Sequence, residues 1–523
     1  MTESGFERTL RRLADGVDVG KFAHGLIGVE KESLRAAPDG TLVHTPHPSA
    51  LGSALTNRFI TTDFSEALLE FVTPANTDYP RVDAMLADLH RFAYRAMGDE
   101  LLWPNSMPCR VGGDDSIPLA NYGSSNVGTM KTVYRRGLGH RYGRVMQTIA
   151  GLHFNYSLPT DLWPELAELA AATDDVDGLR SATYLGLLRN HRRYGWLLLY
   201  LFGASPAMCK SFVEDRFRVL PELNADTVFE PYATSLRMSD LGYSNKTQAR
   251  LAISLNTLDD YIDGLCRAIS TPEPEYQDIG VKVDGRYRQL NANVLQIENE
   301  YYSPMRPKRV ARSGERPTRA LSRGGIEYVE LRSIDLDPFA PIGLELSSAR
   351  FIELFLIYCL LEESPLLDAD ELSRAHRNHA LTASFGRDPG LMLNRDGADI
   401  LLTDWALRIF DRLAALAELI DSRGDTQFAA AVSTHRERIT DAGNTPSARL
   451  ITAIGDRNLS FIEFGLELAR AYRTTLAQTD IDASRLADFV TEADDSINRQ
   501  RDIEASDAIS FDEYLARYFD EPC

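Results

Sequence analysis

Strand-like segments occur in two distant parts of the 523-residue chain, and a mainly helical stretch separates them. The first 160 residues mix short strand-like runs with helices, residues 161–270 have a mainly helical pattern, and residues 279–335 return to strands. From about residue 345 to the end the pattern is helical again. This order predicts a single α+β domain, in which distant parts of the chain build one mainly antiparallel sheet surrounded by helices.

We expect residues 1–345 to contain the sheet with its flanking helices, and residues 346–523 to form a helical C-terminal section packed on the same domain. Apolar side chains at helical spacing predict a helix from Val82 to Met97. The Asp-Gly pair in "VKVDGRYRQL" predicts a β-hairpin, and the Gly/Ser/Asn-rich residues 112–130 predict a long surface loop.

Charge and hydropathy limit the kinds of molecule that the protein is expected to bind and where in the cell it is expected to lie. The formal net charge of −20 disfavours binding to nucleic acid or to an anionic membrane, because the field of the whole protein repels phosphate. No apolar run reaches the roughly 18 residues of a membrane span, and the N-terminal residues lack the pattern of a signal peptide. We therefore expect a cytoplasmic protein. We also expect a monomer or a weak oligomer.

The five cysteines are odd in number, widely spaced and free of any C-x-x-C motif. This arrangement argues against a disulfide framework and against a thiolate zinc site. It predicts that Cys523 carries an exposed thiol and that the other cysteines are small core residues.

One segment departs from the acidic average, since residues 306–323 carry seven Arg or Lys against one Glu. Two interpretations stay open for this basic segment, a solvated loop and an anion-binding site. Only the second would place it at a functional site.

Carboxylates recur at strand positions that share a face. In "GVEKESLR", residues 28–35, alternation puts Glu30 and Glu32 on one side of the strand and Lys31 on the other. Two like charges on one face need a compensating cation, unless the strand is a solvent-facing edge. Glu70 lies inside the apolar run "ALLEFV", shortly after Asp63, and a buried carboxylate there requires a partner or a bound cation.

Two later strands add further polar groups. The segment "GLHFNYSLP" alternates cleanly, so His153 and Asn155 share one face, although a single histidine is more often structural than a ligand. In "GGIEYVELRSIDLDP", Glu330 and Arg332 share a face, and the guanidinium of Arg332 suits a phosphate or a carboxylate.

Together these strands offer mostly oxygen ligands, one imidazole and no thiolate: Glu30, Glu32, Asp63, Glu70, His153 and Glu330. This set favours Mg²⁺ or Mn²⁺, and several carboxylates imply more than one ion. Such clusters neutralise nucleotide phosphates, yet the chain has no P-loop, no strand-linked G-x-G-x-x-G and no kinase motifs. An ATP site would therefore depend on metal ions and on basic residues such as Lys131, Arg135 and those of the basic segment.

Seven motifs, in order between about residues 20 and 345, resemble the proteobacterial-type glutamate–cysteine ligases. They are "GVEKESLR", "TTDFSEALLEFVTP", "WPNSMPC", "RYGRVMQTIAGLHFNYSLP", "SLRMSDLGYSNK", "NVLQIENEYYSPMRPKRVARSGE" and "RGGIEYVELRSIDLDPF". The resemblance implies a sheet of the glutamine-synthetase-like type. It also implies ATP-dependent ligation of L-glutamate to L-cysteine through γ-glutamyl phosphate, which is the first step of glutathione synthesis.

The resemblance implies a role for each matching residue. The six ligand candidates would form the metal shell. Arg332 and Arg237 would act on the reacting groups, and ATP would contact Arg332, Lys131 and Arg306. The substrates would contact Arg135, Tyr134, Arg237, Tyr243, Tyr302 and Asn155, with the cysteine pocket formed by Tyr243 and Tyr302. A surface position is the alternative for Arg237, and an ordinary core or rim position is the alternative for the tyrosines.

Two other interpretations keep the same fold. One is a ligase or kinase that acts on a different amine or on a guanidino acceptor. The other is a catalytically silent metal-binding or amino-acid-binding protein, against which the intact set of repelling carboxylates argues. No catalytic role is assigned after about residue 365.

Overall fold

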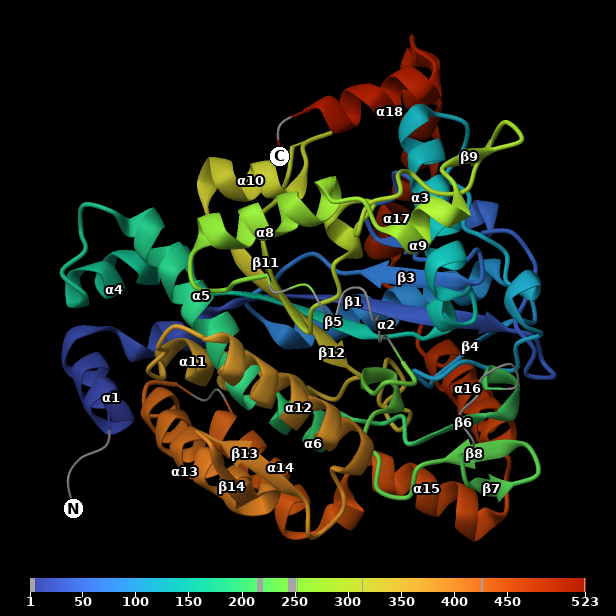
Figure 1. The fold of residues 1–523 in the computed structure, drawn as a ribbon. Helices are drawn as coiled ribbons and strands as arrows, with labels where there is room; N and C mark the ends of the chain where they lie inside the picture. The colour runs from blue at the N-terminus through green and yellow to red at the C-terminus, as the bar shows by residue number, and fades with distance from the viewer. Residues whose placement is uncertain are drawn as a thin grey trace.

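The computed structural model describes residues 5–213, 220–242, 251, 253–312, 314–424, 427–521 and 523. Its centre is an antiparallel sheet in the order β11-β12-β5-β1-β3-β2, with β4 paired to the end of β1. The strands are β1 (Leu26–Ala36), β2 (Ile60–Thr62), β3 (Leu68–Val72), β4 (Leu101–Leu102), β5 (Leu152–Ser157), β11 (Met305–Lys308) and β12 (Tyr328–Ile334). The two strand-bearing regions thus meet in one sheet, as predicted (Figure 1).

Helices lie on both sides of this sheet, and Figure 1 shows α8 to α10 on one side and α11 to α14 on the other. The helices before residue 345 are α1 (Gly5–Gly16), α2 (Tyr79–Ala96), α3 (Asn126–Tyr142), α4 (Trp163–Leu169), α5 (Val176–Tyr194), α6 (Trp196–Phe202), α8 (Leu258–Ser270), α9 (Pro274–Ile279) and α10 (Pro317–Gly324). Those after it are α11 (Leu346–Leu361), α12 (Ala369–Phe385), α13 (Leu402–Asp421), α14 (Phe428–Thr440), α15 (Pro446–Arg457), α16 (Phe461–Ala477), α17 (Ala483–Ser506) and α18 (Phe511–Asp520). The division of the chain at residue 345 stays a prediction.

The most apolar helices are interior elements. Every residue of α6 is buried, and so is most of α11. Within the described parts of the chain, no helix combines the length and the apolar character that crossing a membrane requires.

Short strands outside the central sheet were only partly predicted. The hairpin of β9 (Lys282–Val283) and β10 (Arg286–Tyr287) is confirmed, and Asp284 and Gly285 take the positive φ values of 51° and 78° that a type I′ turn requires. The prediction of a mainly helical stretch over residues 161–270 missed the sheet of β6 (Ala207–Cys209), β8 (Thr227–Phe229) and β7 (Glu222–Asn224). The helical C-terminal pattern likewise missed β13 (Met392–Arg395) and β14 (Ala398–Leu401). Strands of three or four residues are too short to reveal their period.

Two boundaries differ from the sequence prediction. The helix predicted from Val82 is α2 and begins at Tyr79, with a proline in its first turn. The loop predicted over residues 112–130 ends at Ser125, whose side chain accepts a hydrogen bond from the backbone N–H of Gly128 and caps α3. Serine is frequent in loops, but it is also a common helix N-cap.

The prediction for the cysteines was wrong at two positions. Cys266 and Cys523 form a disulfide, so Cys523 is not a free exposed thiol. The two residues are 257 positions apart, and the fold alone brings their Cα atoms to 5.7 Å. Spacing in the sequence gives no sign of such a pair. Cys109, Cys209 and Cys359 are free and buried, as predicted.

Lys31 contacts α2, on the opposite side of β1 from its acidic neighbours, as alternation predicts. Its Nζ lies 2.7 Å from Nε2 of His90, and Nδ1 of His90 lies 2.7 Å from the carbonyl oxygen of Leu86. The neutral imidazole therefore donates to Leu86 and accepts from Lys31. Burial lowers the pKa of Lys31 to about 7.

Replacing Lys31 with methionine is expected to stabilise the protein, most strongly near neutral pH. The unfolded chain binds the lysine proton below about pH 10.5, whereas the folded chain binds it only below about pH 7. As pH falls through this range the wild type loses stability, by about 5 kcal/mol in total, and the variant does not. Urea unfolding at about pH 6.5 and about pH 9.5 measures the difference. Lys21→Met, at the surface, is the control; an equal gain at both pH values would refute the argument.

Candidate active site

A cavity of about 750 Å³ opens against the face of β1 that carries Glu30. All six predicted ligand residues line it: Glu30 and Glu32 of β1, Asp63 after β2, Glu70 of β3, His153 of β5 and Glu330 of β12. The structure therefore brings together side chains that are far apart in the sequence. Their roles as ligands stay a prediction.

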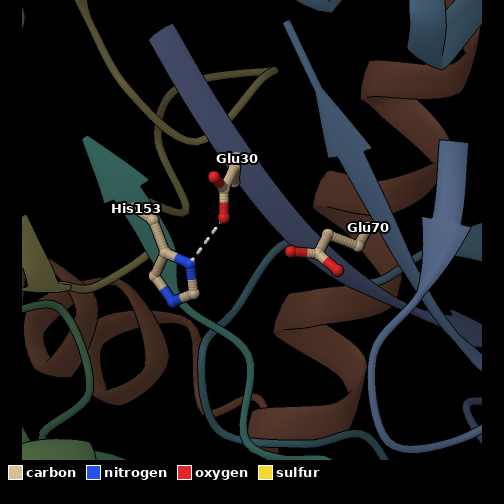
Figure 2. A group of neighbouring side chains, drawn as sticks. All are labelled: Glu30, Glu70 and His153. Carbon is tan, nitrogen blue, oxygen red and sulfur yellow. Dashed lines mark hydrogen bonds and ion pairs between the residues drawn. The ribbon is translucent and has the colours of Figure 1, made fainter. Parts of the chain in front are cut away.

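Strand register explains why these side chains meet. Glu30 is paired with His153 on β5, and Glu32 is paired with Glu70 on β3. Residues directly opposite in an antiparallel pair point to the same side of the sheet. The imidazole of His153 lies between the two β1 carboxylates, with Nδ1 3.2 Å from Glu30 Oε2 and Nε2 3.7 Å from Glu32 Oε1. Figure 2 shows the contact with Glu30 and the carboxylate of Glu70 beside it.

The carboxylates of this cluster differ in their electrostatic surroundings. Burial, together with the charges of Glu30, Asp63 and Glu32, raises the pKa of Glu70 well above its usual value. Burial also raises the pKa of Glu32. Burial is also the largest influence on Glu30, but the hydrogen bond with His153 and the charges of His153 and Lys308 together outweigh it and lower the pKa of Glu30. Among these three carboxyl groups, Glu70 is therefore the one whose ionisation its neighbours disfavour most strongly.

The cluster fits a divalent cation. One ligand atom from each of Glu30, Glu70 and His153 can be chosen so that all three lie within 4.8 Å of one another. Glu330 Oε2 is buried and accepts no hydrogen bond from the described residues. A buried carboxylate oxygen without a donor is costly, and a bound metal ion removes that cost. Several oxygen donors with one imidazole suit Mg²⁺ or Mn²⁺.

Basic side chains hold Glu330 from the other side. Arg332 donates to Glu330 Oε1 at 3.1 Å, and the Nζ of Lys308 lies 3.6 Å from the same oxygen. Burial opposes ionisation of Glu330, but these two cations lower its pKa well below the usual range. Arg332 lies at a β-bulge of β12, between Leu331 and Ile334, and bulges redirect side chains.

Arg237 is buried and lines the cavity, so the surface alternative for this residue is wrong. It lies in a short 3₁₀ turn, where one nitrogen donates to the carbonyl oxygen of Arg332 at 2.7 Å. Another nitrogen lies 3.6 Å from the buried carboxylate of Asp335. The Arg237 guanidinium is therefore fixed beside the residue that holds Glu330.

Helix α3 adds Lys131 and Arg135 to the wall. Both cations lie over the ring of Tyr122, at 5.2 and 4.5 Å from its centre, and Arg135 also donates to the carbonyl oxygen of Asp63. Burial and the charge of Arg135 lower the pKa of Lys131 to about 8. The α3 helix thus presents two positive groups close to the acidic cluster.

The two interpretations of the basic segment, an anion-binding site and a solvated loop, apply to different parts of it. Arg306 and Lys308, on β11, line the cavity, which is the outcome that an anion-binding site requires. Arg306 is held by the carbonyl oxygens of Asn299 and Tyr301. The later arginines form ion pairs outside the acidic cluster: Arg316 with Glu298, Arg319 with Glu521 and Arg323 with Glu315.

Of the predicted substrate residues, Tyr134 and Tyr302 line the cavity. The hydroxyl of Tyr302 lies 3.0 Å from the sulfur of Met238. Tyr243 lies outside the described residues. Asn155 is not part of the cavity wall; its amide donates to Glu30 Oε1 at 2.9 Å, so it orients a carboxylate of the cluster.

Several lining residues were not predicted from the sequence. Arg141 and Glu300 form a buried ion pair at 2.9 Å, and Tyr142 donates to the same carboxylate. Tyr514 and Tyr518 of α18 also line the cavity, in a region to which no role was assigned. The apolar spacing of α18 could have indicated a buried face. It could not have indicated what that face contacts.

The glutamate–cysteine ligase family model matches residues 10–382. A glutamate–cysteine ligase of Pseudomonas putida is 47% identical over 494 residues, which cover 94% of each chain. The Alcanivorax borkumensis enzyme of the same description is 49% identical over 499 residues, or 94% of this chain and 95% of its own.

Solved structures give the same result. The glutamate–cysteine ligase of Francisella tularensis, crystallised with AMP, has a TM-score of 0.89 and 38% identity, covering 95% of this chain and 97% of its own. A bifunctional glutathione synthetase from Pasteurella multocida has a TM-score of 0.72 and 26% identity. The alignment covers 89% of this chain and 54% of that longer one.

Proposed function

The chain belongs to the glutamate–cysteine ligase family, and from that premise we propose a role for each group of side chains in its cavity. The reaction is the ATP-dependent ligation of the γ-carboxyl of L-glutamate to L-cysteine. Its product, γ-glutamylcysteine, is the first intermediate of glutathione synthesis. The observation that carries the assignment to this cavity is the convergence of six metal-ligand candidates and several arginines on one face of the sheet.

The acidic cluster would be the metal site. Glu30, Glu32, Asp63, Glu70, His153 and Glu330 would hold Mg²⁺ or Mn²⁺, and more than one ion, because five carboxylates meet there. Bound metal ions would neutralise the phosphates of ATP and the phosphoryl group in transfer. Asn155 would orient Glu30 for this task through its amide.

The arginines would orient the first step. The γ-carboxylate oxygen of glutamate attacks the γ-phosphorus of ATP, the bond to the β-phosphate oxygen breaks, and ADP leaves γ-glutamyl phosphate behind. Arg332, pinned by Glu330, and Arg237, pinned by the Arg332 carbonyl, would hold charge that develops on the transferred group. Lys131 and Arg306 would contact the phosphates that remain on ADP.

The second step replaces phosphate by the cysteine amine. The amine nitrogen attacks the acyl carbon, the bond from that carbon to the phosphate oxygen breaks, and the proton that the amine loses passes to the released phosphate or to solvent. Tyr134 and Tyr302 would enclose the cysteine, with Tyr243 as a further predicted contact, and Arg135 would lie near the amino-acid substrates. A cavity wall of tyrosine rings excludes water, which would otherwise hydrolyse the acyl phosphate.

A ligase or kinase with a different acceptor is the alternative, and ADP release distinguishes the two. With L-glutamate, Mg²⁺ and ATP, we expect ADP release to rise about tenfold or more when L-cysteine is added, with γ-glutamylcysteine as the product by mass spectrometry. Alanine, 2-aminobutyrate and ammonia are the control acceptors. If one of them supports far faster turnover than cysteine, the acceptor assignment is wrong.

Some properties stay predictions under this proposal. Nucleic acid and membranes are not expected as partners of a chain with a net charge of −20. A monomer or weak oligomer and a cytoplasmic location are likewise expected.

A further inference from the structure

The last part of the chain crosses from one side of the cavity to the other. We call residues 507–521 and 523 the C-terminal strap; it contains α18. In Figure 1, α18 lies above α3 at one end and approaches α8 and α10 at the other. Its inner face repeats at helical spacing, with Phe511, Tyr514, Leu515 and Tyr518 at least partly buried, while the outer face is exposed.

Polar contacts and a small apolar cluster fix the beginning of the strap. The backbone N–H of Asn126, at the start of α3, donates to Asp507 at 2.5 Å. Asp512 accepts hydrogen bonds from Lys282 and from the hydroxyl of Tyr287, in the β9-β10 hairpin, at 2.7 and 2.6 Å. Leu515 is buried in a cluster with Met130 and Val133 of α3 and with Leu290.

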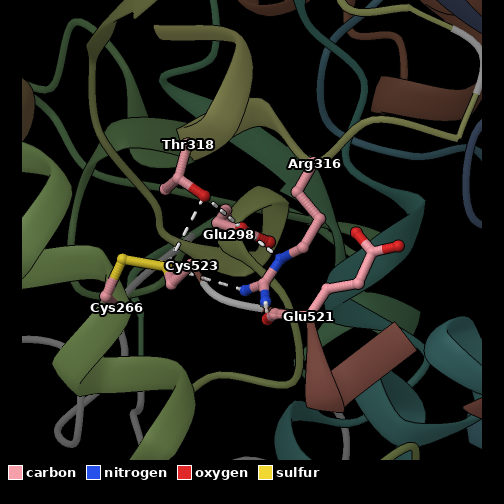
Figure 3. Close-up of a disulfide and its surroundings, with 6 residues drawn as sticks. All are labelled: Cys266, Glu298, Arg316, Thr318, Glu521 and Cys523. Carbon is pink, nitrogen blue, oxygen red and sulfur yellow. Dashed lines mark hydrogen bonds and ion pairs between the residues drawn. A yellow bond between two sulfur atoms is a disulfide. The ribbon is translucent and has the colours of Figure 1, made fainter. Parts of the chain in front are cut away.

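The end of the strap is held covalently. The disulfide between Cys523 and Cys266 joins it to α8, as Figure 3 shows. Arg316 donates to the carbonyl oxygen of Glu521 at 3.2 Å and is itself fixed by the buried carboxylate of Glu298 at 2.9 Å. The remaining ion pair at this end, between Arg319 and Glu521, is half exposed and therefore weak.

Between these two ends the strap contributes to the cavity wall. Tyr514 and Tyr518 lie one helical turn apart and both line the cavity, together with Val127, Met130 and Ile297. The Arg316 guanidinium lies 5.5 Å from the centre of the Tyr518 ring, so the residue that anchors the end of the strap also contacts this wall. The cavity thus has an apolar and aromatic part as well as its charged cluster.

We propose that the C-terminal strap is a wall of the nucleotide site that the Cys266–Cys523 disulfide holds in place, so that reduction of this bond weakens nucleotide binding. This inference rests on the proposed function, because among glutamate, cysteine and ATP only ATP carries a planar aromatic group, which stacks on tyrosine rings. An enzyme that begins the synthesis of a thiol would then bind ATP best when thiols are oxidised.

The redox step needs a small thiol as reductant, a class to which the substrate L-cysteine belongs. Two thiol molecules each give up one hydrogen and join in a new disulfide. The Sγ–Sγ bond of the protein breaks, and Cys266 and Cys523 each gain one hydrogen. Among the described residues, the contacts of Arg316, Arg319 and Thr318 and the apolar face then hold the end of the strap without a covalent bond, so the wall is present for a smaller fraction of the time.

Binding of a non-hydrolysable ATP analogue with Mg²⁺ and L-glutamate tests the proposal without any thiol substrate. Isothermal titration is run on full-length protein, before and after treatment with dithiothreitol and desalting without air. We expect reduction to raise the Kd about fivefold, which corresponds to a strap in place for roughly one fifth of the time. Thiol titration of the unfolded protein checks the redox state of each sample, since the oxidised form has three free thiols and the reduced form has five.

Variants separate the bond from other effects of the reductant. Cys266→Ser, Cys523→Ser and the double variant should all bind like the reduced wild type and should not respond to dithiothreitol. Tyr514→Leu should weaken binding in the oxidised state, whereas Arg517→Ala, on the exposed face of the same helix, should not. An unchanged Kd on reduction, or a response that survives in Cys266→Ser, overturns the proposal. Absence of cysteine-dependent ADP release in both redox states would instead overturn the proposed function.

Discussion

Glutamine in place of Glu70 is expected to give a protein that is nearly inactive and yet more stable than the wild type when no metal is bound. Glu70 faces the carboxylates of Glu30, Glu32 and Asp63, and its pKa is raised for that reason as well as by burial. Glutamine keeps the shape of the side chain and removes the repulsion. Turnover should fall roughly 100-fold or more, because a charged ligand is lost.

The pH dependence of stability shows in which direction the Glu70→Gln substitution should act. A carboxyl whose folded pKa is raised binds its proton more tightly in the folded state, so the wild type loses stability as pH rises from about 4.5 toward the raised pKa. The Glu70→Gln variant should lack that loss. Thermal unfolding of the metal-free proteins from about pH 5 to pH 8 measures it, and Mg²⁺ should then stabilise the wild type more than the variant. A variant that is fully active at saturating Mg²⁺ would show that Glu70 is not a ligand.

Glu330→Gln should abolish turnover equally but change stability in the opposite direction. Glu330 is 2% exposed and is held by Arg332 and Lys308, which are themselves partly exposed, so its removal leaves two half-buried cations without their counter-charge. Breaking a fully buried ion pair costs about 3 kcal/mol, and water screens the partly exposed cations here, so we expect a loss of about 1 to 2 kcal/mol. Removing a carboxylate charge does not destabilise the fold when the neighbouring groups carry the same charge, as they do around Glu70. It does destabilise the fold when the neighbours are cations, as they are around Glu330.

A second change tests the reason for that loss. Lys308→Met in the Glu330→Gln background removes one of the stranded cations, and it should recover part of the stability without recovering activity. Urea unfolding of the metal-free proteins and ADP release are the measurements. If Glu330→Gln is as stable as the wild type, the ion pairs seen here contribute little to folding; if it is active, Glu330 is not required for metal binding.

Alternation along strands predicted the acidic part of the cavity. The parity of Glu30, Glu32 and Lys31 required only that β1 be a strand, whereas the opposite positions of Glu30 and His153 come from the register of β1 and β5, which was not predicted. Glu70 was identified because a carboxylate within an apolar run must have a partner. These rules are local, so they need no knowledge of the fold.

The features that the sequence did not predict depend on contacts between distant parts of the chain. The disulfide joins α8 to the C-terminal strap, and nothing near Cys266 or Cys523 in the sequence distinguishes them from the free cysteines. Alternation predicted the face on which Asn155 lies but not its hydrogen bond to Glu30, and its contact with a substrate stays a prediction. Alternation along a strand predicts the side of the sheet on which a residue lies, whereas tertiary packing decides which residue it contacts on that side.

The order of strands in the sheet has a consequence for biosynthesis. The central strands β12, β5 and β1 come from residues 328–334, 152–157 and 26–36, so the pairing that completes the acidic cluster closes loops of more than one hundred residues. Contacts of such long sequence separation form slowly. On the ribosome, Glu30, Glu32, Glu70 and His153 would emerge well before Glu330 and the cations that balance it. A nascent chain therefore lacks Glu330 and Arg332 until β12 has been made, and the proposed metal site is among the last parts of the sheet to be completed.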